Sequence, residues 1–317
     1  MSLISIVVPC FNEEESLPLY FPAFTEVIDS WHIEDPEVNF ELLLVDDGSS
    51  DGTLGLAKSI AADNDRCFLK VRYISFSRNF GKESAIYAGF QNSRGDFVCT
   101  MDADLQDPPE LLPKMYSILM SEGYDSVATR RVDREGEPPI RSFFARNFYR
   151  VINKISDADI VDGARDYRLM SRQMVDSILS MGEYNRFSKG IFGWVGFKTK
   201  WLPYVNVQRA AGETHWSFLS LFKYAMSGIV AFSTAPLSIA SWVGIACCIF
   251  ALAFTIWIVV KTVLFGDPVG GWPSLACLIT LLGGVQLLSI GIIGQYLSRT
   301  YLEVKHRPIY IVRESNI

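Results

Sequence analysis

Two long stretches of this 317-residue chain contain no charged side chain, and they constrain its fold more than any other feature. One covers residues 224–260 and the other residues 270–298. Each is longer than the roughly 20 residues that an apolar helix needs to cross a bilayer. We therefore expect two transmembrane helices, at residues 237–260 and 272–298. The alternative is a pair of apolar helices buried in the core of a soluble protein.

The basic residues around these stretches predict how the chain sits in the membrane. Four of them lie at positions 198–223, before the first span, and four lie at positions 299–313, after the second. Lys261 is the only base in the connection between the spans. Because cytoplasmic segments next to membrane helices are enriched in Lys and Arg, we expect a multi-pass protein of the cell membrane with both termini in the cytoplasm.

Charge and cysteine content exclude several classes of function. The formal net charge of −6 argues against general nucleic-acid binding. The six cysteines include no C-x-x-C pair, so we expect reduced thiols and neither disulfides nor a zinc site. The apolar N-terminal residues lack a basic leader and are followed at once by the polar run NEEES, which indicates a strand and not a signal peptide.

Short apolar runs alternate with helical patterns over residues 1–130. The runs are ISIVVP, FELLLVDD, FLKVRYISF, DFVCTMDAD and YDSVATR. This alternation predicts βαβ units and a doubly wound, mostly parallel sheet in an α/β fold. Ligands of such sheets bind beyond the carboxyl ends of the strands.

The segment between this region and the spans is less regular. Residues 131–160 are predicted to form a polar loop and then a helix, and residues 161–178 a turn, an extended piece and another helix. Residues 215–233 place apolar side chains at helical spacing, which favours an amphipathic helix at the membrane surface.

Acidic residues follow three of the predicted strands. Glu13 follows the first, Asp46 and Asp47 follow the second, and Asp102 and Asp104 follow the fourth. Because these strand ends should meet at one edge of the sheet, we interpret the acids as one candidate site. Taken alone, DDGSSDGT is explained as well by a capped turn, and a D-x-D pair is frequent by chance.

Acids at a turn between strand and helix do not suit a phosphate cradle, and no glycine-rich phosphate-binding motif follows a strand. Asp47 is instead placed to accept a hydrogen bond from a base N–H or a ribose hydroxyl. A diphosphate can lie beside Asp102 and Asp104 only if a divalent cation bridges them. Mg²⁺ or Mn²⁺ takes one or two carboxylates together with phosphate oxygens.

Four ordered motifs, VVPCFNEE, DDGSSDGT, DADLQDPPE and RFSKGIFGWVGF, resemble those of glycosyltransferase family 2, with its GT-A fold. The most similar branch is that of the polyprenyl-phosphate glycosyltransferases, such as dolichol-phosphate mannose synthase and the bactoprenol glucosyltransferases. The resemblance covers essentially the whole chain, including two C-terminal membrane helices and the tail RPIYIV.

The resemblance implies roles for individual residues. Those implied to bind the nucleotide-sugar are Pro9, Phe11, Glu13, Asp47 and Asp102, and those implied to hold Mg²⁺ or Mn²⁺ are Asp102 and Asp104. The implied catalytic residues are Asp104, Asp166 and Arg186, and the implied ligands of the acceptor phosphate are Arg168, Arg186, Lys189 and Arg209.

Some of these roles have alternatives. Two of the arginines can be explained without a role in binding the acceptor. Arg168 can simply pair with Asp166, and Arg209 can contact a lipid headgroup. Phe11 stands where many relatives have Tyr, and His215 stands where Lys is usual, so a fixed positive charge there is not assured at neutral pH. A phosphate monoester has a second pKa of about 6, so the acceptor needs no strong base. Asp166 is therefore interpreted as positioning a sugar hydroxyl or the metal shell, and only secondarily as a base.

The sequence thus predicts a cytosolic GT-A domain at residues 1–210, an interfacial amphipathic segment at 211–235, two transmembrane helices within 236–298 and a cytosolic tail at 299–317. The expected reaction moves a hexose, glucose from UDP-glucose, to undecaprenyl phosphate with inversion, for modification of a cell-surface glycan. The resemblance also suggests homo-oligomers, tetramers among them.

Three alternatives to this reaction stay open. The donor can be UDP-N-acetylglucosamine or GDP-mannose, because the residues that select the sugar are not identified. A processive polysaccharide synthase is disfavoured, because two spans are too few for a translocation channel and the Q-x-x-R-W motif is missing. A non-catalytic membrane scaffold is disfavoured by the intact DAD and DDGSSDGT motifs.

Overall fold

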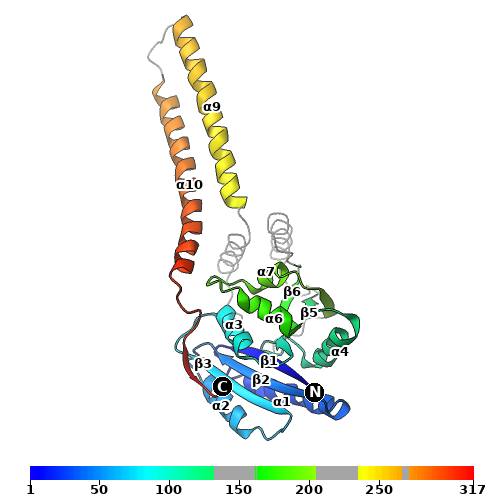
Figure 1. Cartoon of the computed structure of the whole chain (residues 1–317). Coiled ribbons are helices and arrows are strands. Elements are labelled where there is room, and N and C mark those ends of the chain that lie inside the picture. The colour runs from blue at the N-terminus through cyan, green and yellow to red at the C-terminus, as the bar shows by residue number, and fades with distance from the viewer. Residues whose placement is uncertain (132–160, 162, 205–234, 266–270) are drawn as a thin grey trace.

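A computed structural model describes residues 1–131, 161, 163–204, 235–265 and 271–317. Its described strands are β1 (Ser2–Cys10), β2 (Val38–Asp46), β3 (Leu69–Phe76), β4 (Phe97–Thr100), β5 (Ser126–Arg131), β6 (Ala164–Ser171), β7 (Thr199–Tyr204) and β8 (Val312–Ser315). They form one mixed sheet in the order β7-β5-β6-β4-β1-β2-β3-β8 (Figure 1). The block β4-β1-β2-β3 is parallel, as predicted, whereas β6 and β8 run antiparallel to their neighbours.

Helices cover both faces of this sheet. The described helices are α1 (Leu17–Glu34), α2 (Thr53–Asp63), α3 (Lys82–Asn92), α4 (Leu112–Glu122), α6 (Arg172–Ser180), α7 (Ser188–Trp194), α9 (Ala235–Phe265) and α10 (Trp272–Val304), with a short 3-10 turn at Pro109–Leu111. Apolar side chains of α1, α2 and α4 fill one core layer, and those of α3, α6 and α7 fill the layer on the other face.

Local sequence explains why these elements form. Alternate residues of β1 face opposite layers, Ile6 in one core and Val7 in the other, and both are fully buried. Helix α4 has a proline in its first turn, where no hydrogen bond is lost, and ends at Gly123 with φ of 68°. The strands are therefore buried on both faces, which matches their continuous apolar runs.

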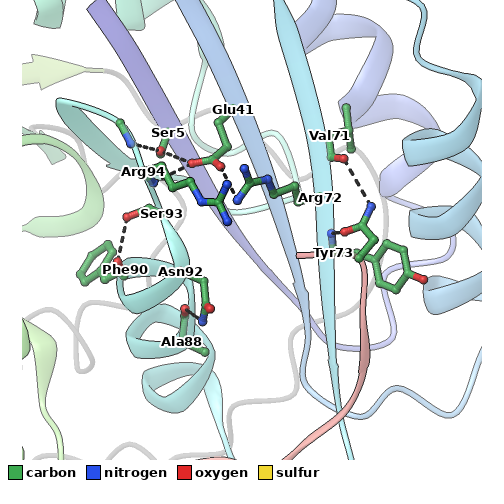
Figure 2. Close-up of polar contacts among 12 residues, drawn as sticks. Ser5, Glu41, Val71, Arg72, Tyr73, Ala88, Phe90, Asn92, Ser93 and Arg94 are labelled. Carbon is green, nitrogen blue, oxygen red and sulfur yellow. Dashed lines mark hydrogen bonds and ion pairs between the residues drawn. The ribbon is translucent and has the colours of Figure 1, made fainter.

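A buried polar network lies inside the parallel block (Figure 2). Glu41 of β2 pairs with Arg72 of β3 at 3.1 Å, and it also accepts hydrogen bonds from the Ser5 hydroxyl and the Arg94 main-chain N–H. Glu41 and Arg72 are both almost completely buried. This network precedes the carboxyl ends of the strands, so we interpret it as structural, a partnered charge inside the sheet.

The described parts of the two uncharged stretches lie in the long helices α9 and α10, which project from the sheet region as a hairpin (Figure 1). Windows at Ala235–Phe254 and Leu281–Val304 are long and apolar enough to cross a membrane. None of the residues in those windows is buried inside the molecule, so the alternative of two core helices is wrong. An exposed apolar surface of this size needs lipid or another protein to cover it.

The C-terminal tail returns to the sheet and is not a free extension. Helix α10 continues to Val304, past the predicted end of the span at residue 298, and β8 then pairs antiparallel with β3. The Tyr310 ring stacks on Phe76 with 4.9 Å between ring centroids, and Glu314 pairs with Lys58 at 2.7 Å. Helix α10 is thereby connected to the sheet that carries the acidic residues.

Three predictions fall outside the described residues. They are the helix expected within residues 131–160, the amphipathic helix expected at 215–233, and the roles of Arg209 and His215.

Candidate active site

The carboxyl ends of β1, β2 and β4 lie along one edge of the sheet, and the start of β6 lies there too. β1 lies between β2 and β4, so the strand order reverses there; ligands of such sheets bind at this edge, and we refer to it as the crevice. Strand β6 runs antiparallel to β4 with Thr100 opposite Arg168, which places Asp166 beyond the end of β4, where Asp102 follows. The predicted acids are therefore brought together by the sheet itself.

The turn after β4 directs the D-x-D carboxylates. Leu105 adopts a left-handed φ of 57°, which is unusual for a branched side chain and marks a constrained turn. The buried Asp107 accepts the Asp102 main-chain N–H at 3.1 Å, and Asp104 accepts the Gln106 N–H at 3.1 Å. Burial, together with the charge of Asp102, raises the pKa of Asp107 to about 7.

A lysine that the sequence analysis did not single out lies between two of these acids. Lys82 Nζ is 2.7 Å from Asp102 Oδ1 and 3.0 Å from Asp166 Oδ2. Burial alone would raise the pKa of Asp166, but Lys82, then Lys189 and Arg168, hold it well below its ordinary range. Asp166 is therefore an ionised carboxylate surrounded by three cations.

Asp47 fixes the segment that leads into α3. Its two carboxylate oxygens accept the main-chain N–H groups of Phe80 at 2.6 Å and Gly81 at 2.9 Å. Burial raises the pKa of Asp47 to about 6, although the two N–H groups act in the opposite direction. Lys82 is the first residue of α3. Asp47, directly after β2, therefore holds the main chain just before that lysine in place.

The turns after β1 and β2 are interlocked. Asn12 adopts a left-handed φ of 55°, its main-chain N–H donates to Ser49 Oγ, and its side chain accepts the Ser50 N–H. The Glu13 N–H donates to Thr53 Oγ1 at 2.8 Å. Phe11 stands at the tip of this arrangement with 46% of its surface exposed, which leaves its ring face open. Pro9 lies within β1, opposite Val45.

A small cationic cavity adjoins Asp166. It has a volume of about 180 Å³, and its lining includes Arg168, Lys189, Phe192 and Trp201. Arg168 is buried with its guanidinium 3.7 Å from the centroid of the Phe192 ring, and its Nε has no hydrogen-bond partner among the described residues. Burial lowers the pKa of Arg168 to about 10, which still leaves it charged at neutral pH. A buried cation with an unsatisfied donor suits an anionic group.

Arg186 occupies a different environment from Arg168 and Lys189. Its guanidinium donates to the main-chain carbonyls of Met181 and Ile178 at the end of α6, and it lies 4.5 Å above the Tyr87 ring. A cation at a helix C-terminus stabilises the unpaired carbonyls there. In this structure the Arg186 side chain therefore caps a helix.

Two further contacts hold the loop around Arg186. Glu303, near the end of α10, accepts the main-chain N–H groups of Tyr184 and Asn185. Glu83, the second residue of α3, accepts both the N–H and the hydroxyl of Ser188, the first residue of α7. The first turn of α3 thus contacts the acids through Lys82 and the cavity wall through Glu83.

The residues missed from the sequence are Lys82, Glu83, Asp107 and Arg165, which donates to Gln106 Oε1 and the Tyr204 hydroxyl. A signal for Lys82 was present, because NFGKE follows a strand and opens a helix, at the same edge of the sheet as the acids. Glu83 lies in the same NFGKE run and Asp107 lies in the DADLQDPPE motif, whereas no comparable signal marks Arg165.

Comparisons with known proteins place the chain among glycosyltransferases. A family model described as glycosyl transferase family 2 matches residues 5–179. CsbB of Bacillus subtilis (strain 168), named as a glycosyltransferase, is 43% identical over 315 residues, 99% of this chain and 92% of that protein. The prophage bactoprenol glucosyl transferase homologue of Escherichia coli (strain K12) is 39% identical over 310 residues, 98% of each protein.

Two further proteins are similar. The bactoprenol glucosyl transferase of Shigella phage SfII is 39% identical over 313 residues, 99% of this chain and 98% of that protein. A crystal structure of glucosyl-3-phosphoglycerate synthase from Mycobacterium tuberculosis aligns with a TM-score of 0.49 and 18% identity, over 72% of this chain and 78% of that one. The family assignment depends on the sequence relatives.

Proposed function

We propose that this chain, which belongs to glycosyltransferase family 2 and to its polyprenyl-phosphate branch, transfers glucose from UDP-glucose to undecaprenyl phosphate. The observation that carries the proposal is the extent of the similarity. Relatives named as bactoprenol glucosyl transferases match this chain over its sheet region and over both apolar helices, because the alignments cover 98% or more of it.

The donor is proposed to bind at the carboxyl ends of β1 and β2. The exposed Phe11 ring offers a face on which a nucleotide base can stack, and Pro9 and Glu13 flank it. Each Asp47 oxygen accepts one main-chain N–H and retains a second lone pair for a base N–H or a ribose hydroxyl. The nucleotide would thus extend from β1 and β2 toward the D-x-D turn.

Asp102 and Asp104 fit a divalent cation by the chemistry of their donor atoms. Asp102 keeps 28% of its side chain exposed and already accommodates one positive charge, the Lys82 ammonium. Among the described residues no group of three or more His, Cys, Asp or Glu side chains forms a complete metal site. Mg²⁺ needs only one or two carboxylates when substrate phosphates supply other ligands, and when bound it would neutralise the departing diphosphate.

The acceptor phosphate is proposed to bind in the cationic cavity, with Arg168 and Lys189 as its ligands. The Arg168 Nε–H is available there, and an arginine can donate two parallel hydrogen bonds to a phosphate. The aromatic rings of Phe192 and Trp201 line the same cavity. Arg186 stays a predicted ligand, although using it would require its guanidinium to leave the end of α6.

The proposed reaction inverts the anomeric carbon. An acceptor phosphate oxygen forms the new bond to that carbon, the bond to the β-phosphate oxygen of UDP breaks, and its electron pair leaves with UDP. Asp166 is not the base in this step, because its pKa is held far below neutrality by its cationic neighbours. Its carboxylate would instead accept a sugar hydroxyl and keep the anomeric carbon in line with the acceptor.

The hairpin of α9 and α10 is proposed to position this site at the membrane. We propose that α9 and α10 hold the sheet at the cytoplasmic surface, at the depth where a polyprenyl chain exposes its phosphate, so that the search for the acceptor is confined to two dimensions. The division into a catalytic region at 1–210, an interfacial segment at 211–235 and membrane spans within 236–298 belongs to this proposal. The sheet domain also includes β8 from the tail.

The test is transfer of radiolabelled sugar into organic-extractable lipid. Purified full-length protein is incubated with undecaprenyl phosphate, Mg²⁺ or Mn²⁺, and UDP-glucose, with UDP-N-acetylglucosamine and GDP-mannose in parallel. We expect label in lipid from UDP-glucose only and a loss of at least 100-fold in Asp104→Asn. Asp63→Asn, an exposed carboxylate at the end of α2, is the matched control and should keep full activity.

Other outcomes of this assay identify the rival functions. Label from a different single donor would replace glucose in the proposal and leave the reaction class intact. Label in long polymer would indicate a synthase. No label from any donor, with folded protein and lipid present, would indicate a scaffold.

A further inference from the structure

The Lys82 side chain joins two acids that have different proposed tasks. Its ammonium contacts both oxygens of Asp102, at 2.7 and 2.9 Å, and Asp166 Oδ2 at 3.0 Å. Asp102 is a proposed metal ligand, whereas Asp166 is proposed to hold the sugar. A lysine in this place is therefore at the centre of the donor site and not at its margin.

The main chain at this lysine is held in place, whereas its side chain is partly exposed. Asp47 holds the main-chain N–H groups of Phe80 and Gly81, and a side chain at Gly48 would collide with the main chain of Arg78, which shows how tightly that segment packs. The Lys82 side chain itself is 43% exposed. Four methylene groups on a fixed main chain allow the ammonium to swing within the crevice.

Lys82 and a divalent cation would compete for Asp102. The ammonium contacts both oxygens of this carboxylate, at 2.7 and 2.9 Å, so a divalent cation held by Asp102 would meet a second positive charge beside it and be repelled. Asp166 would not lose its positive surroundings if Lys82 moved, because Lys189 and Arg168 also face it. The nearest new anion would then be the diphosphate that arrives with the metal.

We propose that Lys82 is an exchangeable counter-ion of the donor site. It neutralises Asp102 and Asp166 while the site is empty, and it turns to the diphosphate of the nucleotide-sugar when a divalent cation occupies Asp102. This inference rests on the proposed function and adds to it a cation that binds the leaving group. A lysine ammonium is a compact point charge suited to such a phosphate contact.

The proposal predicts effects of opposite sign on two binding constants. In Lys82→Met, which keeps the length and removes the charge, Mn²⁺ alone should bind about tenfold more tightly, because its competitor is gone. UDP in the presence of saturating Mn²⁺ should bind at least tenfold more weakly, because a phosphate ligand is gone. Lys200→Met is the matched control, a half-exposed lysine that pairs with Glu122 at 3.0 Å far from the crevice, and both constants should stay at the wild-type value.

The measurements are Mn²⁺ binding by electron paramagnetic resonance of the free ion and UDP binding by calorimetry, with GDP in parallel, on full-length protein in detergent. Lys82→Arg keeps the positive charge and should keep the weaker Mn²⁺ affinity of the wild type.

The outcomes separate this inference from the proposed function. Unchanged or weaker Mn²⁺ binding in Lys82→Met would overturn the competition, and unchanged UDP binding would overturn the transfer to the diphosphate. A uniform loss of both affinities would show a structural role and would also overturn it. If the wild type binds neither Mn²⁺ nor a nucleoside diphosphate, the proposed metal-dependent donor site fails first and this inference fails with it.

Discussion

At the scale of single residues, the site depends on backbone positions that only particular side chains tolerate. Gly48 has φ of +69°, and a Cβ there would lie 2.4 Å from the main-chain carbon of Arg78. Such a distance is far inside van der Waals contact. Gly48 thus permits the turn after β2 to pack on the segment that leads into α3, which in turn carries Lys82.

Gly48→Ala should therefore destabilise the protein by about 1–3 kcal/mol or more and reduce activity, because both the left-handed φ and the contact are strained. Gly55→Ala is the matched control. A Cβ at Gly55, in α2, would meet nothing within 4 Å, and alanine there should be neutral or stabilising by up to about 1 kcal/mol. Thermal unfolding in detergent measures both, and equal effects at the two positions would contradict the packing argument.

Asp47 predicts a pH dependence of stability. Its pKa is raised to about 6 from an ordinary value of 3.8, so the native state holds this proton more tightly than the unfolded chain. The stabilisation is complete below pH 3.8 and is lost as the pH rises through 6. Asp47→Asn cannot ionise and should not suffer this loss.

The measurement is the difference in Tm between Asp47→Asn and the wild type from pH 4 to pH 7. We expect the Tm of the variant to increase relative to the Tm of the wild type as the pH rises. The lost carboxylate contacts can lower the Tm of the variant at pH 4, but this does not change the trend. A difference in Tm that stays constant across this range would show that ionisation of Asp47 does not destabilise the native state.

At the scale of elements, β8 is an unexpected part of the sheet. It covers the edge of β3, whose main-chain groups would otherwise be free to pair with another chain. Asn316 adds hydrogen bonds to the main chain of Tyr73, and the Tyr310 hydroxyl bonds with the side chains of Gln91 and Asn92 of α3. The tail therefore contacts the same helix that begins with Lys82.

Tyr310→Ala should lower stability by about 2–3 kcal/mol and increase proteolysis of the tail, because it removes both the stacking on Phe76 and the hydroxyl bonds. Tyr310→Phe keeps the ring and should cost only about 1 kcal/mol, the usual worth of such hydrogen bonds. Unfolding in detergent and limited proteolysis followed by mass spectrometry give the two values. If both variants matched the wild type, β8 would not hold the tail in solution.

At the scale of the whole molecule, the helix hairpin and the sheet are joined at two places. Glu303 near the end of α10 holds the loop that precedes α7, and β8 pairs with β3. The second helix thus contacts the loop that leads into α7, and the tail that follows this helix reaches the far edge of the sheet. This connection fixes the position of the sheet relative to the hairpin, as the proposed transfer to an acceptor embedded in lipid requires.

The predicted topology can be read with reporter fusions. Alkaline phosphatase, which is active only outside the cytoplasm, should be active when fused after residue 268, between the helices. It should be inactive when fused at residue 210 or at the C-terminus, because the basic residues flank the hairpin on the cytoplasmic side. Activity at residue 210 would invert the topology and place the proposed site on the wrong side for a cytosolic nucleotide-sugar.

The local elements were accessible from the sequence because periodicity and composition are local properties. The strands of the parallel block, the carboxylates at their ends and the two apolar helices all follow from runs of neighbouring residues. Strand β7 was missed, because TKWLPY is short and has no strong alternation. The positions of the acids were accessible as well, since parallel strands end at one edge.

Only the tertiary structure decided which partners these elements and side chains find. The antiparallel direction of β6, the return of β8 to β3 and the contact of Lys82 with Asp166, 84 positions away, all join distant parts of the chain. The partner of Arg186 could not be predicted from the sequence either. A cation is attracted to any nearby carbonyl or acid, and the folded chain brings the end of α6 closest to it. The sequence by itself determined what chemistry is present and at which edge, and long-range packing determined which charge meets which.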